Sequence, residues 1–151
     1  MAKSRTRFLN VDLDLQSVAE PDPLIKALGS AVLCQRVGRV GRAHRVRFML
    51  SRQPASPSDA IVGFAKLVTK FPDEGRAIWN NARSKEFDIG IESGFEPFSA
   101  EWVLERRVID VIAELGARLR ITVYAPDVPG AAGGRPTSKS PKKPRRRETR
   151  S

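Results

Sequence analysis

Alternation of apolar and polar residues near the start of the chain limits the fold more than any other feature. Between Phe8 and Leu15 the odd positions from 9 onward are apolar, whereas Asn10, Asp12 and Asp14 stand between them. Successive side chains of a β-strand point to opposite faces, so the pattern predicts a strand with one buried and one polar face. Such a strand needs partner strands and a second layer of structure over its apolar side.

Further predicted elements follow in a regular order. The strands after the first cover 31–34, 46–50, 87–91, 98–104 and 119–123. The helices cover 20–28, 56–83, which Pro72 ends or kinks so that a second piece runs to about Arg83, and 106–115. A helix beginning at Ser99 is the alternative for the fourth of these later strands. The order β-α-β-β-α-β-β-α-β predicts an α+β fold, in which a mixed sheet of five to six strands carries its helices on one face. A ferredoxin-like order is expected for the first four strands.

Positive charge is concentrated at the C-terminal end. The 151 residues hold 27 Lys or Arg and 17 Asp or Glu, a net charge of +10. Residues 131–151 hold eight basic residues and one acid, a net of +7, which leaves +3 for the rest of the chain. These last residues include no aromatic and no aliphatic larger than Ala, so we expect 127–151 to be a disordered basic tail. Residues 1–7 are expected to form a loose basic arm, and 8–126 a single α+β domain.

The cysteine content and the hydropathy bear on location. Cys34 is the only cysteine, and no apolar run reaches the ~18–20 residues of a membrane span. We therefore expect a cytoplasmic protein without a disulfide and without membrane contact. Because Cys34 stands in an apolar predicted strand, a buried structural thiol is expected.

The polar face of the predicted sheet combines acids and bases as candidate partner-binding residues. The acids are Asp12, Asp14, Asp88 and Glu92, and the bases are Arg45, Arg47, Arg118 and Arg120. One interpretation is a set of cross-strand ion pairs on a solvated face. The second is a charged surface for a protein partner. The third is a divalent-metal cluster of the acids for phosphodiester cleavage, although no Lys or His stands beside them at a nuclease spacing.

Motifs for catalysis are missing from the sequence. His44 is the only histidine, and its place in an Arg-rich hairpin predicts a surface position. One His and one Cys cannot form a zinc site. The glycines around Arg39 lack the helix that follows a phosphate loop. We therefore predict no enzyme, no catalytic residue, no metal and no cofactor.

Two basic segments are candidates for nucleic-acid binding. The predicted hairpin contributes Arg36, Arg39 and Arg42, and its glycines would let the tip bend toward a partner. The tail contributes Lys142, Lys143, Arg145, Arg146 and Arg147, within a run similar to the SPKK elements of histone-type tails and to nuclear-localisation signals. Both would bind phosphates in a salt-dependent way. A solvated hairpin tip is the alternative.

Three stretches resemble an uncharacterised bacterial α+β family. They are 8–15, 87–91, and Leu115-Gly116-Ala117 with the strand that ends in Tyr124-Ala125-Pro126. The family is similar to the domain-of-unknown-function 4279 group, some members of which are associated with immunity proteins of toxin systems. The resemblance covers about residues 7–126, and it implies a fold but no site residues.

The prediction is therefore a small non-enzymatic bacterial binding protein of the immunity type. It would engage a protein partner through the charged sheet face or the Arg-rich hairpin. The first alternative is a nucleic-acid-associated protein that uses its tail and hairpin on phosphates. The second alternative is a metal-dependent nuclease.

Overall fold

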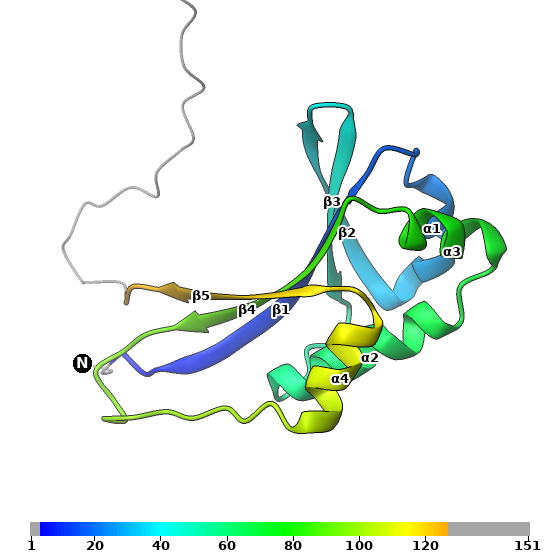
Figure 1. Ribbon diagram of the computed structural model, residues 1–151. Coiled ribbons are helices and arrows are strands. Elements are labelled where there is room, and N and C mark those ends of the chain that lie inside the picture. The colour runs from blue at the N-terminus through cyan, green and yellow to red at the C-terminus, as the bar shows by residue number, and fades with distance from the viewer. Residues whose placement is uncertain (1–3, 127–151) are drawn as a thin grey trace, which may run out of the picture.

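The computed structural model describes residues 4–126 (Figure 1). The strands are β1 (Arg7–Ser17), β2 (Val32–Val40), β3 (Ala43–Leu50), β4 (Ser84–Glu92) and β5 (Arg118–Tyr124). The helices are α1 (Asp22–Leu28), α2 (Pro57–Thr69), α3 (Asp73–Asn80) and α4 (Arg106–Glu114), and a 3₁₀ turn, η1 (Gly29–Ala31), follows α1. The disorder expected for 127–151 lies outside the described residues, as do residues 1–3. No helix within the described range is long and apolar enough to cross a membrane.

The five strands form one mixed sheet in the order β2-β3-β1-β4-β5. Strand β1 runs antiparallel to both of its neighbours, β3 and β4, and β2 runs antiparallel to β3. The first four strands therefore have the ferredoxin-like order. Strand β5 follows α4 and lies parallel to β4 at one edge of the sheet, which makes the sheet mixed. The predicted α+β class is confirmed.

The hydrophobic core lies between the sheet and the helices. All four helices lie on one side of the sheet, with α1 beside α3 and α2 beside α4, and the opposite face carries no helix in the described part (Figure 1). Leu13 of β1 is fully buried and pairs in register with Phe48 of β3 and Phe87 of β4. The Phe87 ring lies 5.9 Å from the ring of Phe64 on α2, centroid to centroid. The period-two pattern of β1 thus buries the apolar side that the sequence predicts.

Proline and serine mark the helix boundaries as predicted. The Ser56 hydroxyl accepts a hydrogen bond from the backbone N–H of Asp59 at 3.2 Å, which caps the first turn of α2. Helix α2 ends at Thr69, and Pro72 stands at the start of α3. Pro72 makes helical dihedral angles unfavourable for the residue before it, so the chain forms two helices instead of one.

The predicted strand over 98–104 is wrong, and so is the alternative helix beginning at Ser99. Residues 93–105 form a long connection without regular structure apart from one isolated bridge at Glu96. The alternating residues of this segment cannot form a hairpin with β4, because β5 already occupies the free edge of β4. The side chain of Phe98 is consequently fully exposed.

The β2–β3 hairpin is longer than the sequence predicts. Its strands continue to Val40 and restart at Ala43, so the turn contains only Gly41 and Arg42. Gly41 has a φ of 60°, and glycine at the first position of a two-residue turn is typical of the type II′ hairpin. Gly38, with a φ of 128°, follows an irregularity in the strand register. This bulge lets the ladder continue through a stretch that reads as loop in the sequence.

The expectation of a loose N-terminal arm does not hold for residues 4–7. The backbone N–H of Thr6 donates to the carbonyl of Glu96 at 2.8 Å, and that of Phe95 donates to the carbonyl of Ser4 at 2.9 Å. Arg7 is already the first residue of β1. These contacts join residues far apart in sequence, so no local pattern could predict them.

Candidate functional site

A charge ladder runs across the face of the sheet that carries no helix. We use this name for four acids and four arginines on neighbouring strands: Asp12, Asp14, Glu86, Asp88, Arg45, Arg47, Arg118 and Arg120. In the β1–β4 register, Asp12 lies opposite Asp88 and Asp14 lies opposite Glu86. The two central strands therefore carry the acids, and the flanking strands β3 and β5 carry the arginines.

On the β3 side, two arginines enclose Asp14. Arg47 donates from Nε to Oδ1 and from Nη2 to Oδ2, both at 3.2 Å. Arg45 donates to Oδ2 at 3.3 Å. Asp14 is only 5% exposed although it lies on the helix-free face. The guanidinium groups lie across the carboxylate and remove it from water, so its charge is already compensated.

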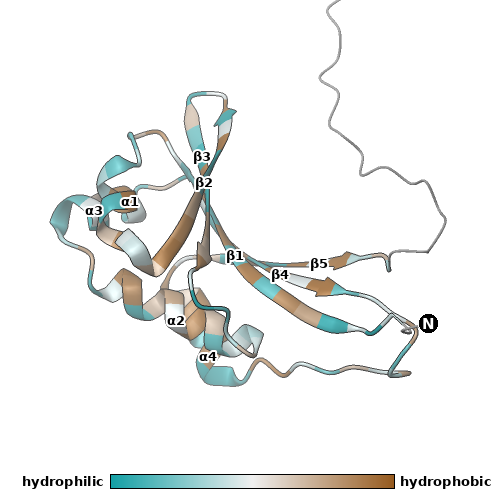
Figure 2. Cartoon of the chain, turned by 180° about the vertical axis from the view of Figure 1, so that it is seen from behind, coloured by the Kyte–Doolittle hydropathy of each residue, from teal (hydrophilic) through white to brown (hydrophobic). Residues whose placement is uncertain are grey.

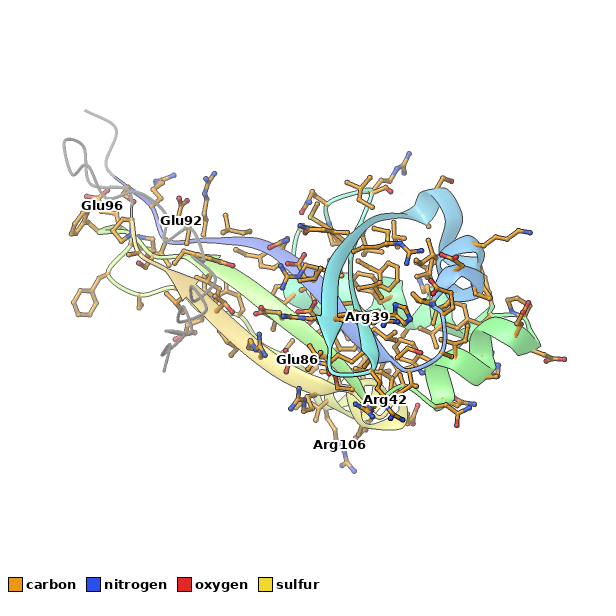
Figure 3. The ribbon with its side chains drawn as sticks, turned by 90° about the horizontal axis from the view of Figure 1, so that it is seen from above. Arg39, Arg42, Glu86, Glu92, Glu96 and Arg106 are labelled. Atoms are coloured by element: carbon orange, nitrogen blue, oxygen red, sulfur yellow. The ribbon has the colours of Figure 1, made fainter. Side chains whose placement is uncertain are left out.

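On the β5 side, Glu86 has the equivalent position. Arg120 Nη2 lies 2.7 Å from Oε1, and Arg118 Nη2 lies 3.1 Å from Oε2. Glu86 is 7% exposed. The side chain lies along the middle of the sheet, remote from Glu92 at the far end (Figure 3). Each outer strand of the ladder is thus tied to a central strand by a carboxylate with two arginines.

The remaining two acids are held less tightly. Thr122 donates its hydroxyl to Asp88 Oδ1 at 2.7 Å, and Asn10 donates its amide to Asp12 Oδ1 at 2.9 Å. Burial raises the pKa of Asp12, Arg47 opposes that rise, and the carboxylates of Asp14 and Asp88 add to it. Burial and the two neighbouring carboxylates therefore disfavour the ionised form of Asp12.

The placement of the acids gives no support to a metal cluster. Glu92 is bound by Arg7, with Nε and Oε2 2.5 Å apart, at the far end of β1 and β4. Asp14 has its oxygens occupied by guanidinium groups. Across residues 4–126, no group of three or more His, Cys, Asp or Glu side chains is placed to hold a metal ion. The geometry is that of cross-strand ion pairs.

The sequence reasoning missed two residues of this face. Glu86 is central to the ladder but lies one residue before the start of the predicted strand, and Arg7 was assigned to the arm. Glu86 has a detectable signal, because it has the same parity as Asp88 and Glu92. Arg7 has none, because alternation would place it on the apolar face, and it pairs with Glu92 only after a shift of register between Phe8 and Asn10. Extending the alternating pattern by one residue would have found Glu86.

The hairpin arginines differ in whether they have a carboxylate partner. Arg36 contacts Glu20 at 3.2 Å and also forms an ion pair with Asp22 at the start of α1. Arg39 Nη2 lies 3.1 Å from His44 Nε2. Arg42 stands in the turn (Figure 3). Within residues 4–126, neither Arg39 nor Arg42 forms an ion pair. Three candidates for nucleic-acid binding thus have two different environments, and those of the tail, from Lys142 to Arg147, lie outside the described residues.

Two single residues differ from their expected environments. Cys34 is exposed instead of buried, because β2 is an edge strand and its outer residues extend past the helices. Partial shielding of the thiol still raises the pKa of Cys34, and Arg36 opposes this rise. His44 is half-buried and lies 3.5 Å from Glu20, so it is not a free surface histidine.

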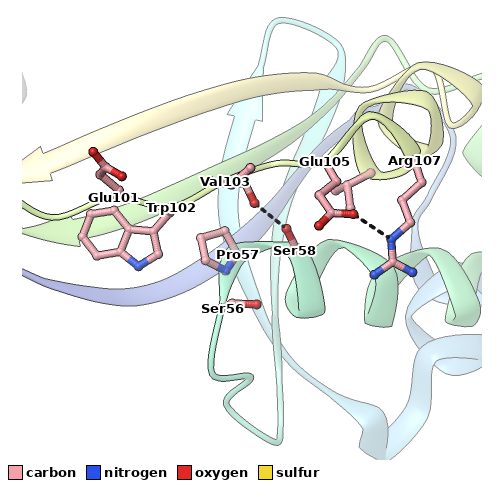
Figure 4. A pocket seen from close by; sticks show the side chains of 9 residues that line it. Ser56, Pro57, Ser58, Glu101, Trp102, Val103, Glu105 and Arg107 are labelled. Carbon is pink, nitrogen blue, oxygen red and sulfur yellow. Dashed lines mark hydrogen bonds and ion pairs between the residues drawn. The ribbon is translucent and has the colours of Figure 1, made fainter.

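A hollow lies between the start of α2 and the segment before α4 (Figure 4). Trp102 and Pro57 contribute apolar surface to it. Several of its polar groups contact one another: the Ser58 hydroxyl donates to the Val103 carbonyl at 3.2 Å, and Glu105 pairs with Arg107 at 3.8 Å. The hollow therefore presents no set of convergent acid, base and nucleophile.

Comparisons of the chain with protein-family models, with curated proteins and with solved structures found no match. The family resemblance described above therefore stays a prediction.

Proposed function

We propose that the protein binds another protein and that the tip of the β2–β3 hairpin makes the contact. The observation that carries the proposal is the contrast between two sets of arginines. Those of the charge ladder are neutralised by Asp14 and Glu86, whereas Arg39 and Arg42 have no carboxylate partner within residues 4–126. A guanidinium on a projecting hairpin that has no carboxylate partner is available to an acid on another molecule.

The surroundings of these arginines favour a protein surface as partner. Val37 and Val40 are exposed beside Arg39. Protein interfaces combine apolar contact area with arginine, and a few such residues supply most of the binding energy. The expected partner surface is an apolar depression with carboxylates at its rim. An immunity protein, as the resemblance predicts, is one class of such binder.

Nucleic acid is a less suitable partner for this hairpin. Phosphate contacts need cations but give no role to exposed valines. The hairpin also has no Phe, Tyr or Trp between 32 and 47 on which a base could stack, and the His44 ring is half-buried beside Glu20. We therefore expect the hairpin not to bind nucleic acid, and such binding would overturn the proposal.

The proposal is tested by affinity purification with the full chain as bait, expressed in its source cells. The variant carries Arg39→Ala and Arg42→Ala. The matched control carries Arg106→Ala and Arg107→Ala on α4, which removes the same charge from exposed positions whose contacts to Asp110 and Glu105 are 3.8 Å long. We expect a stoichiometric protein with the wild type and the control but not with the hairpin variant. Calorimetry with the purified partner should show that the wild type and the control bind it more tightly than the hairpin variant does.

Two results would contradict the proposal. One is a partner that binds the hairpin variant as tightly as the control. This result would show that the contact lies elsewhere on the protein. The other is nuclease-sensitive recovery with no stoichiometric protein, together with a fluorescence anisotropy signal on short duplex DNA that falls steeply with salt. That pattern would favour the nucleic-acid alternative, since counterion release makes phosphate binding salt-dependent.

A further inference from the structure

The free edge of β5 carries an uncovered apolar row. Leu119, Ile121 and Val123 are all exposed, and Ile121 is 59% exposed. They pair in register with Phe87, Ile89 and Ile91 of β4, so they extend the same apolar face that the helices bury further inside the sheet. The hydrophobic colour along β5 marks this row (Figure 2).

The other sheet edge is blunted in ways that β5 is not. Strand β2 contains an irregularity of register between Arg36 and Gly38, and its outer residues include two arginines. Bulges and charges are the usual means of preventing an edge from pairing with another chain. Strand β5 runs in unbroken register with β4, contains neither proline nor glycine, and its Arg118 and Arg120 are held by Glu86. Its backbone edge is therefore a template for one more strand.

We propose that β5 pairs antiparallel with β5 of a second copy of this chain, in a register centred on Ile121. This register pairs every residue of Arg118–Tyr124. It places Ile121 opposite itself and Leu119 opposite Val123, so apolar side chains meet on the helix side. On the other face it places Arg118 opposite Tyr124 and Arg120 opposite Thr122, so no two arginines lie directly opposite each other.

This self-complementarity is the reason for naming a second copy as the occupant. The cation of Arg118 meets an aromatic ring, and Arg120 meets a hydroxyl, while both stay paired to their own Glu86. A shift of the centre to Arg120 would bring like charges together. The basic tail is a poor occupant, since residues 131–151 contain no aliphatic side chain larger than Ala. A two-fold axis through Ile121 would give one continuous sheet through both copies.

The hairpin stays accessible in such a dimer. Strands β2 and β3 lie at the sheet edge remote from β5. The two hairpins would therefore stand at opposite ends of the joined sheet and could each contact a partner. The dimer does not depend on the proposed function of the hairpin, and either proposal can fail alone.

The test uses sedimentation velocity on the full chain over a range of concentrations, with circular dichroism to verify folding. The wild type is expected to be a dimer. Ile121→Lys and Ile121→Glu should each be monomers, because the two-fold axis brings each new charge against itself. An equimolar mixture of the two should restore a dimer that contains one of each. Leu33→Lys on β2 is the matched control, since Leu33 is 57% exposed on the other edge strand, and it should stay a dimer.

A wild type that is monomeric at every concentration would overturn the proposal, as would a dimer that survives both Ile121 substitutions. Loss of the dimer in the Leu33 variant alone would place the interface at β2 instead. If a charged variant does not fold, Ile121→Cys in a Cys34→Ser background gives an independent measurement. A short bismaleimide should link two copies of that variant, and absence of a linked dimer would count equally against the proposal.

Discussion

Arg47 holds Asp14 at two points across the β1–β3 pair, with Nε on Oδ1 and Nη2 on Oδ2, both at 3.2 Å. The carboxylate is buried although it lies on the face without helices. Its shielding comes from Arg45 and Arg47, which means that the ion pairs themselves form the cover of this part of the sheet. The ladder is thus a structural element as well as a set of charges.

Removal of Asp14 should lower the free energy of unfolding. In Asp14→Ala, Arg45 loses its counter-charge and Arg47 keeps only the 3.9 Å contact with Asp12, so we expect a loss of about 2–3 kcal/mol. Urea denaturation measures this change. Asp110→Ala is the control, because its ion pair with Arg106 is exposed on α4 and should contribute less than about 0.5 kcal/mol. Equal stability of the two variants would show that the Asp14 pairs contribute nothing beyond a surface pair.

Replacement of Glu86 should loosen β5. In Glu86→Gln the two arginines on β5 lose the carboxylate that ties them to β4, so we expect a loss of about 1–3 kcal/mol. Hydrogen exchange of the 118–124 amides should accelerate more than that of β1. The control is Glu92→Gln, whose ion pair with Arg7 lies at the end of the sheet. Exchange that accelerates equally in β1 and β5 would contradict a local role.

Replacement of Asp12 should change the dependence of stability on pH. Burial raises the pKa of Asp12 above its ordinary value of 3.8, so ionisation of this group destabilises the folded state. The cost is fully present above the raised pKa and disappears as the pH falls below 3.8. Asp12→Asn should therefore have a higher Tm than the wild type at pH 7, and the difference should shrink as the solution is acidified. Thermal scans across pH test this, and a difference that is independent of pH would refute it.

A side chain at Gly94 should displace the N-terminal segment. A Cβ there would lie 2.5 Å from the carbonyl oxygen of Ser4 and from the carbonyl carbon of Arg5, which are backbone atoms that cannot move aside easily. We expect Gly94→Ala to be destabilised by about 1–3 kcal/mol and to be cleaved faster by proteases near residue 5. Gly75→Ala on α3 is the control, since its nearest neighbour would be 3.6 Å away and alanine favours a helix. Cleavage at the same rate in both variants would contradict the predicted contact.

The candidate site was partly predictable. Alternation over 8–15 placed Asp12 and Asp14 on the polar face, because period two is a property of any strand. The same reasoning placed Arg118 and Arg120 on one face of their strand. Which strands are neighbours does not follow from these local patterns, so the pairing of Glu86 with Arg118 and Arg120 was not found. The contact of Ser4–Thr6 with residues 94–96 is equally non-local.

The sequence by itself determined the class of fold, the helix boundaries at Ser56 and Pro72, and the polar face of Asp12 and Asp14, since all of these depend on neighbours within a few positions. The order of the elements also predicted a ferredoxin-like order for the first four strands, but only the tertiary structure decided where β5 and residues 93–105 lie. Residues 98–104 have a strand-like pattern but form no strand, because β5 takes the edge of β4. The same choice of neighbour places arginines over Glu86 and leaves the apolar row of β5 at a free edge. The position of β5 beside β4 is set by the packing of the whole core, and the alternating pattern of a single strand carries no information about it.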